Sequence, residues 1–222
     1  MEDRHISLPE QKNYERALAQ AQQLALEKLA AIADIQEQCR KSGAQYQLAG
    51  SKKTAIIRYL NQPFTISIPE GEIAPADDTS EQLTPRDRLI ILHYFLTAKG
   101  TPPSGKLVTF RELPEGGVYQ PTFAKRTIQP LLANFGKEPH NLLLFSQLMG
   151  GYKADYGDTA ITINAFARVQ VTFVVWQGDE EFASQGNVLF DANITDYLPT
   201  EDITVLCEII TWKLVRSLKA SQ

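Results

Sequence analysis

The sequence predicts an α+β fold in which two similar helix–three-strand–helix halves surround antiparallel sheet, with a long helix at the N-terminus. Three patterns support this prediction. Residues 10–42 carry a helical apolar stripe, short stretches then alternate apolar and polar side chains in two groups, and a capped apolar helix closes each group. Of the 222 residues, 43% are hydrophobic and 22% are charged, as in soluble globular proteins. We therefore expect a single domain over residues 1–222.

The first half of the chain reads as one long helix, three strands and a second helix. Apolar residues from Tyr14 to Cys39 fall on one stripe at about 100° per residue, and Gly43 suits the end of that helix. Strands are expected over residues 44–48, 55–60 and 64–68. Residues 69–83, rich in Pro, Gly and Asp, indicate an exposed connection. Thr84 then begins a capping box that opens an apolar, deeply buried helix.

The second half repeats this order of elements with different lengths. A short strand is expected over residues 106–110, and residues 120–134 read as a helix that Pro130 must kink or interrupt. A short apolar helix follows over residues 138–149. Three further strands are expected over residues 159–165, 169–176 and 187–190. The last helix is capped at Thr200 and runs to about Leu218.

The shared order of elements raises the question of an internal repeat, with halves at residues 10–100 and 119–220. Few residues are identical between the halves, and helices with antiparallel strands also occur together without any duplication. A true duplication predicts two superposable halves related by a pseudo-twofold axis. A ligand site would then be expected at the seam between them.

Composition excludes several classes of protein. The chain has no stretch of about 18 apolar residues and its N-terminus lacks the apolar segment of a signal peptide, so we expect a cytoplasmic protein without a membrane span. Zinc and iron–sulfur sites need about four clustered ligands, which Cys39, Cys207, His5, His93 and His140 do not supply. No metal ion is therefore expected to bind directly. The formal net charge of −4 argues against a general nucleic-acid binder.

The charge is spread unevenly along the chain. Residues 150–202 hold nine acidic and two basic side chains, a net charge of −7, whereas residues 101–130 have a net charge of +2. The acidic side chains either solvate turns and helix starts or present a negative potential to a ligand or to the other half. Motifs of the common hydrolases, nucleotide-binding proteins and dehydrogenases are missing from the sequence.

The most distinctive stretch lies between Phe110 and Arg126. Its two adjacent glycines allow an irregular loop, and a helix that begins near Tyr119 would direct its free amides toward that loop. Two arginines could then hold a carboxylate or phosphate. Alternatively, ion pairs Arg111–Glu112 or Arg126–Glu115 simply pin the loop. The candidate ligand-binding residues here are Arg111, Glu112, Gly116, Gly117, Tyr119 and Arg126.

Two candidates lie outside this stretch. His93 falls in a buried helix, where it is either a hydrogen-bonded core residue or the axial ligand of a metal-centred cofactor. Asp158 and the acidic residues 179–181 belong to turns between strands. They could bind a hard cation, although no calcium-loop spacing is present and a solvated turn explains them as well.

Several stretches after the first helix occur together, in the same order, in one known family. They are Leu89–Leu96, Phe110–Pro114, Gly117, Tyr119, Phe123, Arg126, Gly157–Ala160, Trp176–Phe182, Leu189–Asp191, Tyr197–Leu198, Glu201 and Asp202. In this combination the chain resembles the family named domain of unknown function 3786. The resemblance implies a prokaryotic, mostly anaerobic setting, in which some relatives are joined to, or placed beside, iron–sulfur and corrinoid proteins. The chain lacks their extra cysteine module, so the resemblance brings no cluster role to it.

Three functions follow from these observations. The preferred one is a non-catalytic small-molecule or cofactor-binding protein, with a corrinoid or other tetrapyrrole as ligand, in anaerobic metabolism. The second is an enzyme with acid–base chemistry in a cleft that holds Arg111, Glu112, Tyr119, Arg126 and Asp158. The third is an interaction or accessory protein that docks on an anaerobic enzyme, or on a second copy, through the first and last helices. The first function predicts one pocket that contains both arginines and the buried histidine.

Overall fold

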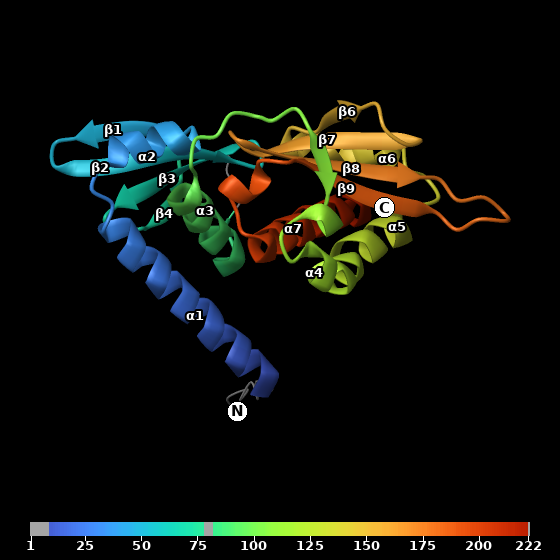
Figure 1. The fold of residues 1–222 in the computed structure, drawn as a ribbon, viewed down its shortest axis with the longest axis horizontal. Coiled ribbons are helices and arrows are strands. Elements are labelled where there is room, and N and C mark those ends of the chain that lie inside the picture. The colour runs from blue at the N-terminus through green and yellow to red at the C-terminus, as the bar shows by residue number, and fades with distance from the viewer. Residues whose placement is uncertain (1–8, 78–81, 222) are drawn as a thin grey trace.

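A computed structural model describes residues 9–77 and 82–221 and has the α+β class predicted from the sequence. Figure 1 shows two antiparallel sheets side by side. The first has the order β1-β2-β3-β4, with bounds Gln45–Ala49, Lys52–Tyr59, Gln62–Ile68 and Ile73–Pro75. The second has the order β5-β9-β8-β7-β6, with bounds Leu107–Thr109, Gln185–Asp191, Val169–Trp176, Thr159–Phe166 and Tyr152–Ala154.

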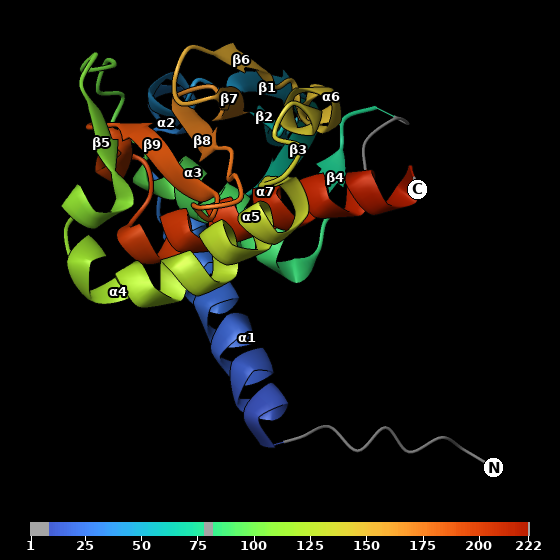
Figure 2. The same ribbon diagram turned by 90° about the vertical axis from the view of Figure 1, so that its right-hand side faces the viewer.

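Helices α3, α4, α5 and α7 lie below the sheets in the first view, α2 and α6 lie at the level of the strands, and α1 projects away from the rest of the molecule (Figures 1 and 2). The helices are α1 (Pro9–Ala30), α2 (Ile35–Ser42), α3 (Pro85–Thr97), α4 (Gly116–Phe123), α5 (Gln129–Phe135), α6 (Asn141–Ser146) and α7 (Thr200–Ala220). A π-helical segment, Ala124–Ile128, joins α4 to α5. Within residues 9–77 and 82–221, no helix combines the length and the apolarity needed to cross a bilayer.

The single helix predicted over residues 10–42 is wrong, because the chain breaks between α1 and α2. Asp34 has extended backbone angles, φ −121° and ψ 94°, and its side chain accepts a hydrogen bond from the Glu37 N–H at 2.9 Å. This N-cap starts a new helix, which ends at a left-handed Gly43 as predicted. Buried residues continue along both helices, so apolar periodicity alone does not reveal the break.

The strand predictions are confirmed with shifted boundaries, and the structure adds two short strands. Strand β4 lies inside the connection expected to be exposed, where Ile73 is buried and pairs with Ile66 of β3. Strand β6 extends the edge of the second sheet, with Lys153 opposite Ile161. Both are three residues long. Both also adjoin Gly- and Pro-rich sequence, in residues 69–83 and at Gly150-Gly151, which predicts a connection rather than a strand.

The helix predicted over residues 120–134 begins earlier, at Gly116, and passes through the π-helical segment before Pro130. Pro130 has no N–H with which to continue the helical hydrogen bonds, and it follows directly after the π-helical segment, where the Gln129 N–H donates to the Ala124 carbonyl oxygen. The proline therefore interrupts the α-helical pattern, as predicted, without ending the helical run.

The structure does not show two matching halves. The sheets contain four and five strands. In the second sheet the edge strand β5 pairs with β9, although helices separate it from β6–β9 in the sequence. They meet where the Leu60 N–H donates to the Ala165 carbonyl oxygen at 3.0 Å. Strands β1-β2-β3 and β7-β8-β9 each follow one another in order, so the internal repeat stays a prediction.

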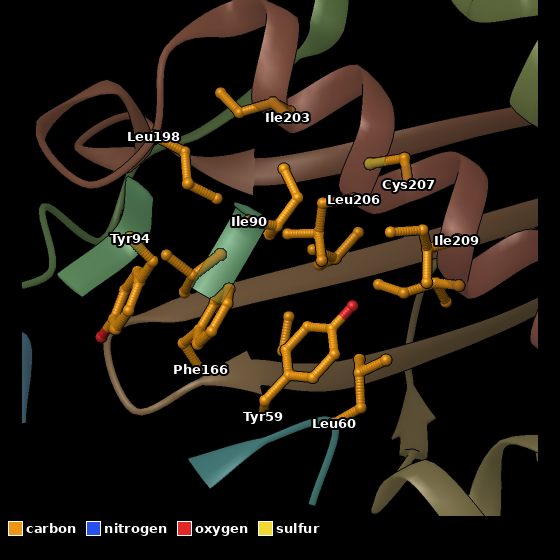
Figure 3. Packing of buried hydrophobic residues seen from close by; sticks show 14 of the residues in the cluster. Tyr59, Leu60, Ile90, Tyr94, Phe166, Leu198, Ile203, Leu206, Cys207 and Ile209 are labelled. Atoms are coloured by element: carbon orange, nitrogen blue, oxygen red, sulfur yellow. The ribbon is translucent and has the colours of Figure 1, made fainter. Parts of the chain in front are cut away.

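The core lies between the sheets and helices α3 and α7. Figure 3 shows Tyr94 beside Phe166 and Leu206 above Tyr59, and the Tyr94 and Phe166 rings stack with centroids 3.9 Å apart. The buried Tyr59 hydroxyl donates to Asp87 Oδ1 at 2.8 Å. The other carboxylate oxygen of Asp87 accepts from the backbone N–H of Thr84, which confirms the predicted capping box. The carboxylate of Asp87 thus links strand β2, through Tyr59, to the start of helix α3.

Candidate functional site

Helices α3 and α7 pack side by side and are joined by two polar pairs. Arg86 of α3 forms a forked interaction with Glu208 of α7, at 2.6 and 3.3 Å. Further along α3, His93 Nδ1 lies 2.7 Å from Asp202 Oδ2. Because residue numbers rise along α3 while those of their partners fall along α7, the two helices are antiparallel. The two pairs mark a polar seam on the side of the molecule where α1 lies.

Two adjoining hollows on this seam form one groove, which we call the α1–α7 groove. The hollows have volumes of about 580 and 480 Å³ and share Tyr14, Arg86 and Glu208. The larger one is mainly apolar and is lined by Leu18 of α1 and by Ile209 and Trp212 of α7, with Glu15 and Arg216 among its charged residues. The smaller one is more polar than the larger one and is lined further by Tyr119, Thr122, Arg126, Glu201, Thr204 and Val205. Figure 1 shows α1 running below α3 and α7.

The charges of the polar end are only partly paired. The Glu208 side chain is 16% exposed, and Arg86 satisfies it with two hydrogen bonds. Burial alone lowers the pKa of Arg86, but the hydrogen bonds and charge of Glu208 raise it more, so the guanidinium stays charged. Arg126 comes within 3.9 Å of Glu208, too far for a hydrogen bond. Among the described residues, Glu201 has neither a hydrogen bond nor an ion pair.

The backbone of the α4–α5 run explains the position of Arg126. It belongs to the π-helical segment, which carries Thr127 into the interior, where the threonine is fully buried. Arg126, one residue earlier, points outward to the groove and remains 52% exposed. Single π-helical turns are rare and occur often at functional sites, because they change the direction of side chains within a helix.

The Gly-Gly loop differs in geometry from the arrangement expected of the predicted anion site. The helix starts at Gly116 rather than near Tyr119, after Glu115 in a left-handed conformation with φ 60°. Glu112 accepts hydrogen bonds from the Thr109 N–H at 2.7 Å and its hydroxyl at 2.8 Å, and these bonds lower the Glu112 pKa. Arg111 is exposed and has no hydrogen bond or ion pair within the described residues.

The two glycines have different roles. A Cβ atom at Gly116 would lie 2.0 Å from the Phe110 carbonyl oxygen, whereas one at Gly117 would meet open space. The close packing of the backbone against Phe110 therefore explains why the first position is a glycine. Neither predicted loop ion pair forms, because Glu112 caps Thr109 and Arg126 approaches Glu208 instead of Glu115.

Asp158 lies at one end of the second sheet, outside the groove. Its Oδ2 accepts a hydrogen bond from the Gln177 N–H at 2.8 Å. Nearby, Asp179 Oδ1 accepts from the Glu181 and Phe182 N–H groups, which lower the Asp179 pKa. Within residues 9–77 and 82–221 no three His, Cys, Asp or Glu side chains could hold a metal ion together. These acidic side chains are thus accounted for as turn-forming residues.

His93 lines a separate hollow of about 530 Å³ between α1 and α3. Its walls are mostly apolar, with Leu24, Leu96 and the stem of Lys28 among them. Asp202 holds Nδ1, so Nε2 is the nitrogen left without a partner in the described residues. Neither Arg111 nor Arg126 lines this hollow, so the predicted pocket with both arginines and His93 does not form.

The structure therefore brings together Tyr119 and Arg126 and leaves the other predicted residues elsewhere. The groove residues that the sequence does not indicate are Tyr14, Arg86, Glu201 and Glu208, whereas Trp212 is expected from the sequence only on a second face of the last helix, covered by the domain or by another subunit. Trp212 carries one usable signal, since it lies off the core stripe of the last helix and is 42% exposed. Arg86 and Glu208 are 122 residues apart, and no local pattern pairs them.

A family model described as a domain of unknown function (DUF3786) matches residues 34–212. No curated protein and no solved structure is detectably similar to the chain. The match begins at Asp34, the N-cap of α2, and ends at Trp212 within α7. Helix α1, which forms one wall of the groove, lies outside the matched residues.

Proposed function

The chain belongs to the DUF3786 family, whose description assigns no activity, and we propose from the α1–α7 groove that it is a small-molecule-binding protein. One observation supports this most: apolar side chains and incompletely paired charges line one continuous groove. Ligand sites commonly combine such walls with a few polar groups that fix orientation. The proposal keeps the cytoplasmic, anaerobic prokaryotic setting expected from the sequence and the resemblance.

Binding is favoured over the acid–base enzyme because the residues expected in a catalytic cleft are dispersed. Glu112 and Asp158 each accept backbone hydrogen bonds in separate turns. Burial raises the pKa of Cys39 to about 11 and also raises that of Cys207, so both thiols are protonated and poor nucleophiles. Arg126 and Tyr119 remain in the groove, where they can orient a ligand.

A thermal-shift screen of small organic molecules on the full chain tests the proposal. Trp176→Phe leaves Trp212, which lines the groove, as the single tryptophan. Compounds that raise the Tm through binding should also change the emission of Trp212. Their affinity should fall in Arg126→Gln and stay constant in Arg111→Gln, which removes an exposed arginine outside the groove. If no compound produces both changes, the proposal is wrong.

A metal-centred tetrapyrrole is a second candidate ligand, and the orientation of His93 favours it. A histidine that donates Nδ1–H to a carboxylate presents Nε2 as a ligand, the arrangement found around protein-bound metals. The hollow beside it is apolar, and Lys28 could pair with an acidic substituent. The metal would arrive within its macrocycle, because the part of the chain that the structure describes places no further metal-ligating side chain beside His93 and its partner Asp202.

Absorbance titrations with cobalamins and haems test this second candidate. Coordination by His93 should shift the visible bands and raise the Tm of the full chain, and His93→Ala should abolish both effects. His140→Ala, which removes an exposed histidine at the start of α6, is the matched control. Spectra that stay unchanged with every compound, or shift equally in His93→Ala, would remove this candidate.

A further inference from the structure

The polar end of the α1–α7 groove contains two side chains of opposite charge that do not pair with each other. Four charged residues line it, and Arg86 and Glu208 neutralise one another at 2.6 Å. Arg126, on the π-helical segment, is paired only at 3.9 Å with Glu208, and Glu201, in the first turn of α7, has no ion pair within the described residues. No ion pair within the described residues joins them.

This arrangement discriminates against ligands with a single charge. A simple anion at Arg126 would also experience the negative charges of Glu201 and Glu208. A simple cation at Glu201 would experience Arg86 and Arg126. A molecule that carries both charges can satisfy both groups, since Arg126, which has no hydrogen bond from Glu208, can donate forked hydrogen bonds to a carboxylate and Glu201 can accept from an ammonium group. Tyr14 and Tyr119 add hydroxyl groups to the same walls.

The apolar end of the groove indicates what the rest of the ligand is. Beyond Tyr14 and Arg86, which both hollows share, the groove continues to Leu18, Ile209 and Trp212, and its walls here, although mainly apolar, also include Glu15 and Arg216. Trp212 is 42% exposed in the groove, so a ligand that covers it would remove apolar surface from water. Apolar or aromatic groups of a ligand fit this end of the groove, and the charged groups of the same ligand fit the polar end.

We infer that the α1–α7 groove binds a free amino acid with an apolar or aromatic side chain. Arg126 holds its carboxylate, Glu201 holds its ammonium group, and the side chain of the ligand lies toward Trp212. This inference rests on the proposed function, because it specifies the ligand class of the same groove.

Fluorescence titration of the Trp176→Phe protein tests the inference with matched probes. L-Phenylalanine is compared with 3-phenylpropionate, which lacks the amino group, and 2-phenylethylamine, which lacks the carboxylate. L-Leucine is compared in the same way with 4-methylpentanoate and 3-methylbutylamine. We expect at least one amino acid to bind with a Kd about tenfold lower than either of its counterparts, a difference of about 1.4 kcal/mol.

Variants then assign each charge to its partner. Arg126→Gln should weaken amino-acid binding about tenfold and leave the amine unaffected or bound more tightly. Glu201→Gln should also weaken amino-acid binding and leave the carboxylate probe unaffected or bound more tightly. Arg111→Gln is the control with unchanged affinity. Both groove residues are exposed, so their variants should keep the wild-type Tm, which is measured alongside.

The outcomes separate this inference from the proposed function. If 3-phenylpropionate or 2-phenylethylamine binds as tightly as L-phenylalanine, and the leucine series agrees, the ligand need not carry both charges and the inference is wrong. It is also wrong if neither amino acid binds while screened compounds still change Trp212 emission, although the proposed function then stands. If nothing binds in the groove, both fail.

Discussion

At the scale of single residues, short-range contacts explain the distinctive loop better than ligand binding does. Gly116 is needed because the Phe110 carbonyl oxygen lies where a Cβ atom would be, only 2.0 Å away. Gly117 has no such neighbour, although it stands beside Gly116 in the same helix. Two adjacent glycines therefore look alike in the sequence and differ in the structure.

Alanine substitutions at these two glycines should have opposite effects on stability. Gly116→Ala should lower the free energy of unfolding by about 2 kcal/mol or more, because the backbone must move to relieve the clash. Gly117→Ala should leave it unchanged or raise it by up to about 1 kcal/mol, since alanine favours the helix. Urea unfolding of both variants measures this. Equal losses in the two would contradict the packing explanation.

At the scale of elements, predictions succeeded where the signal was local. The Thr84–Asp87 capping box and the Gly43 helix end each depend on a few adjacent residues, and both are confirmed. The break at Asp34 was missed because the apolar stripe continues across it, although Asp34 is itself a favourable N-cap. The groove could not be predicted, since Arg86 and Glu208 meet only when α3 packs on α7.

The connection after α3 offers a test at this scale through Asp191. Its carboxylate accepts hydrogen bonds from the Ser104, Gly105 and Asn193 N–H groups, which fixes that connection to the end of β9. Burial alone would raise the Asp191 pKa, but these bonds lower it more, so the net pKa lies below its ordinary value of 3.8. A lowered pKa adds stability above 3.8 that is lost as pH falls through the folded-state value.

Asp191→Asn should therefore be less sensitive to acid than the wild type. We expect it to be less stable at pH 6 and to lose less free energy of unfolding between pH 5 and about pH 2. Urea unfolding at a series of pH values measures both the stability at pH 6 and the stability that is lost at acidic pH. The same slope against pH in the two proteins would show that Asp191 contributes nothing to acid sensitivity.

At the scale of the whole molecule, the two sheets share one buried core with α3 and α7, which supports a single domain. Trp176 lies at one end of the second sheet and Trp212 lies on α7, so each reports on a different part. The single-tryptophan variants Trp176→Phe and Trp212→Phe should unfold in urea with one transition each. Each fluorescence transition should coincide with the circular dichroism transition of the same variant, as two-state unfolding requires. Transitions that separate would indicate two independently folding parts.

The position of the ligand in a crystal structure tests the central claim most directly. The full chain would be crystallised with the tightest amino acid or screened compound that changes Trp212 emission. We predict electron density in the α1–α7 groove, with a carboxylate on Arg126, an ammonium group on Glu201 and an apolar group against Trp212. Density in the hollow beside His93, or anywhere outside the groove, would contradict the account.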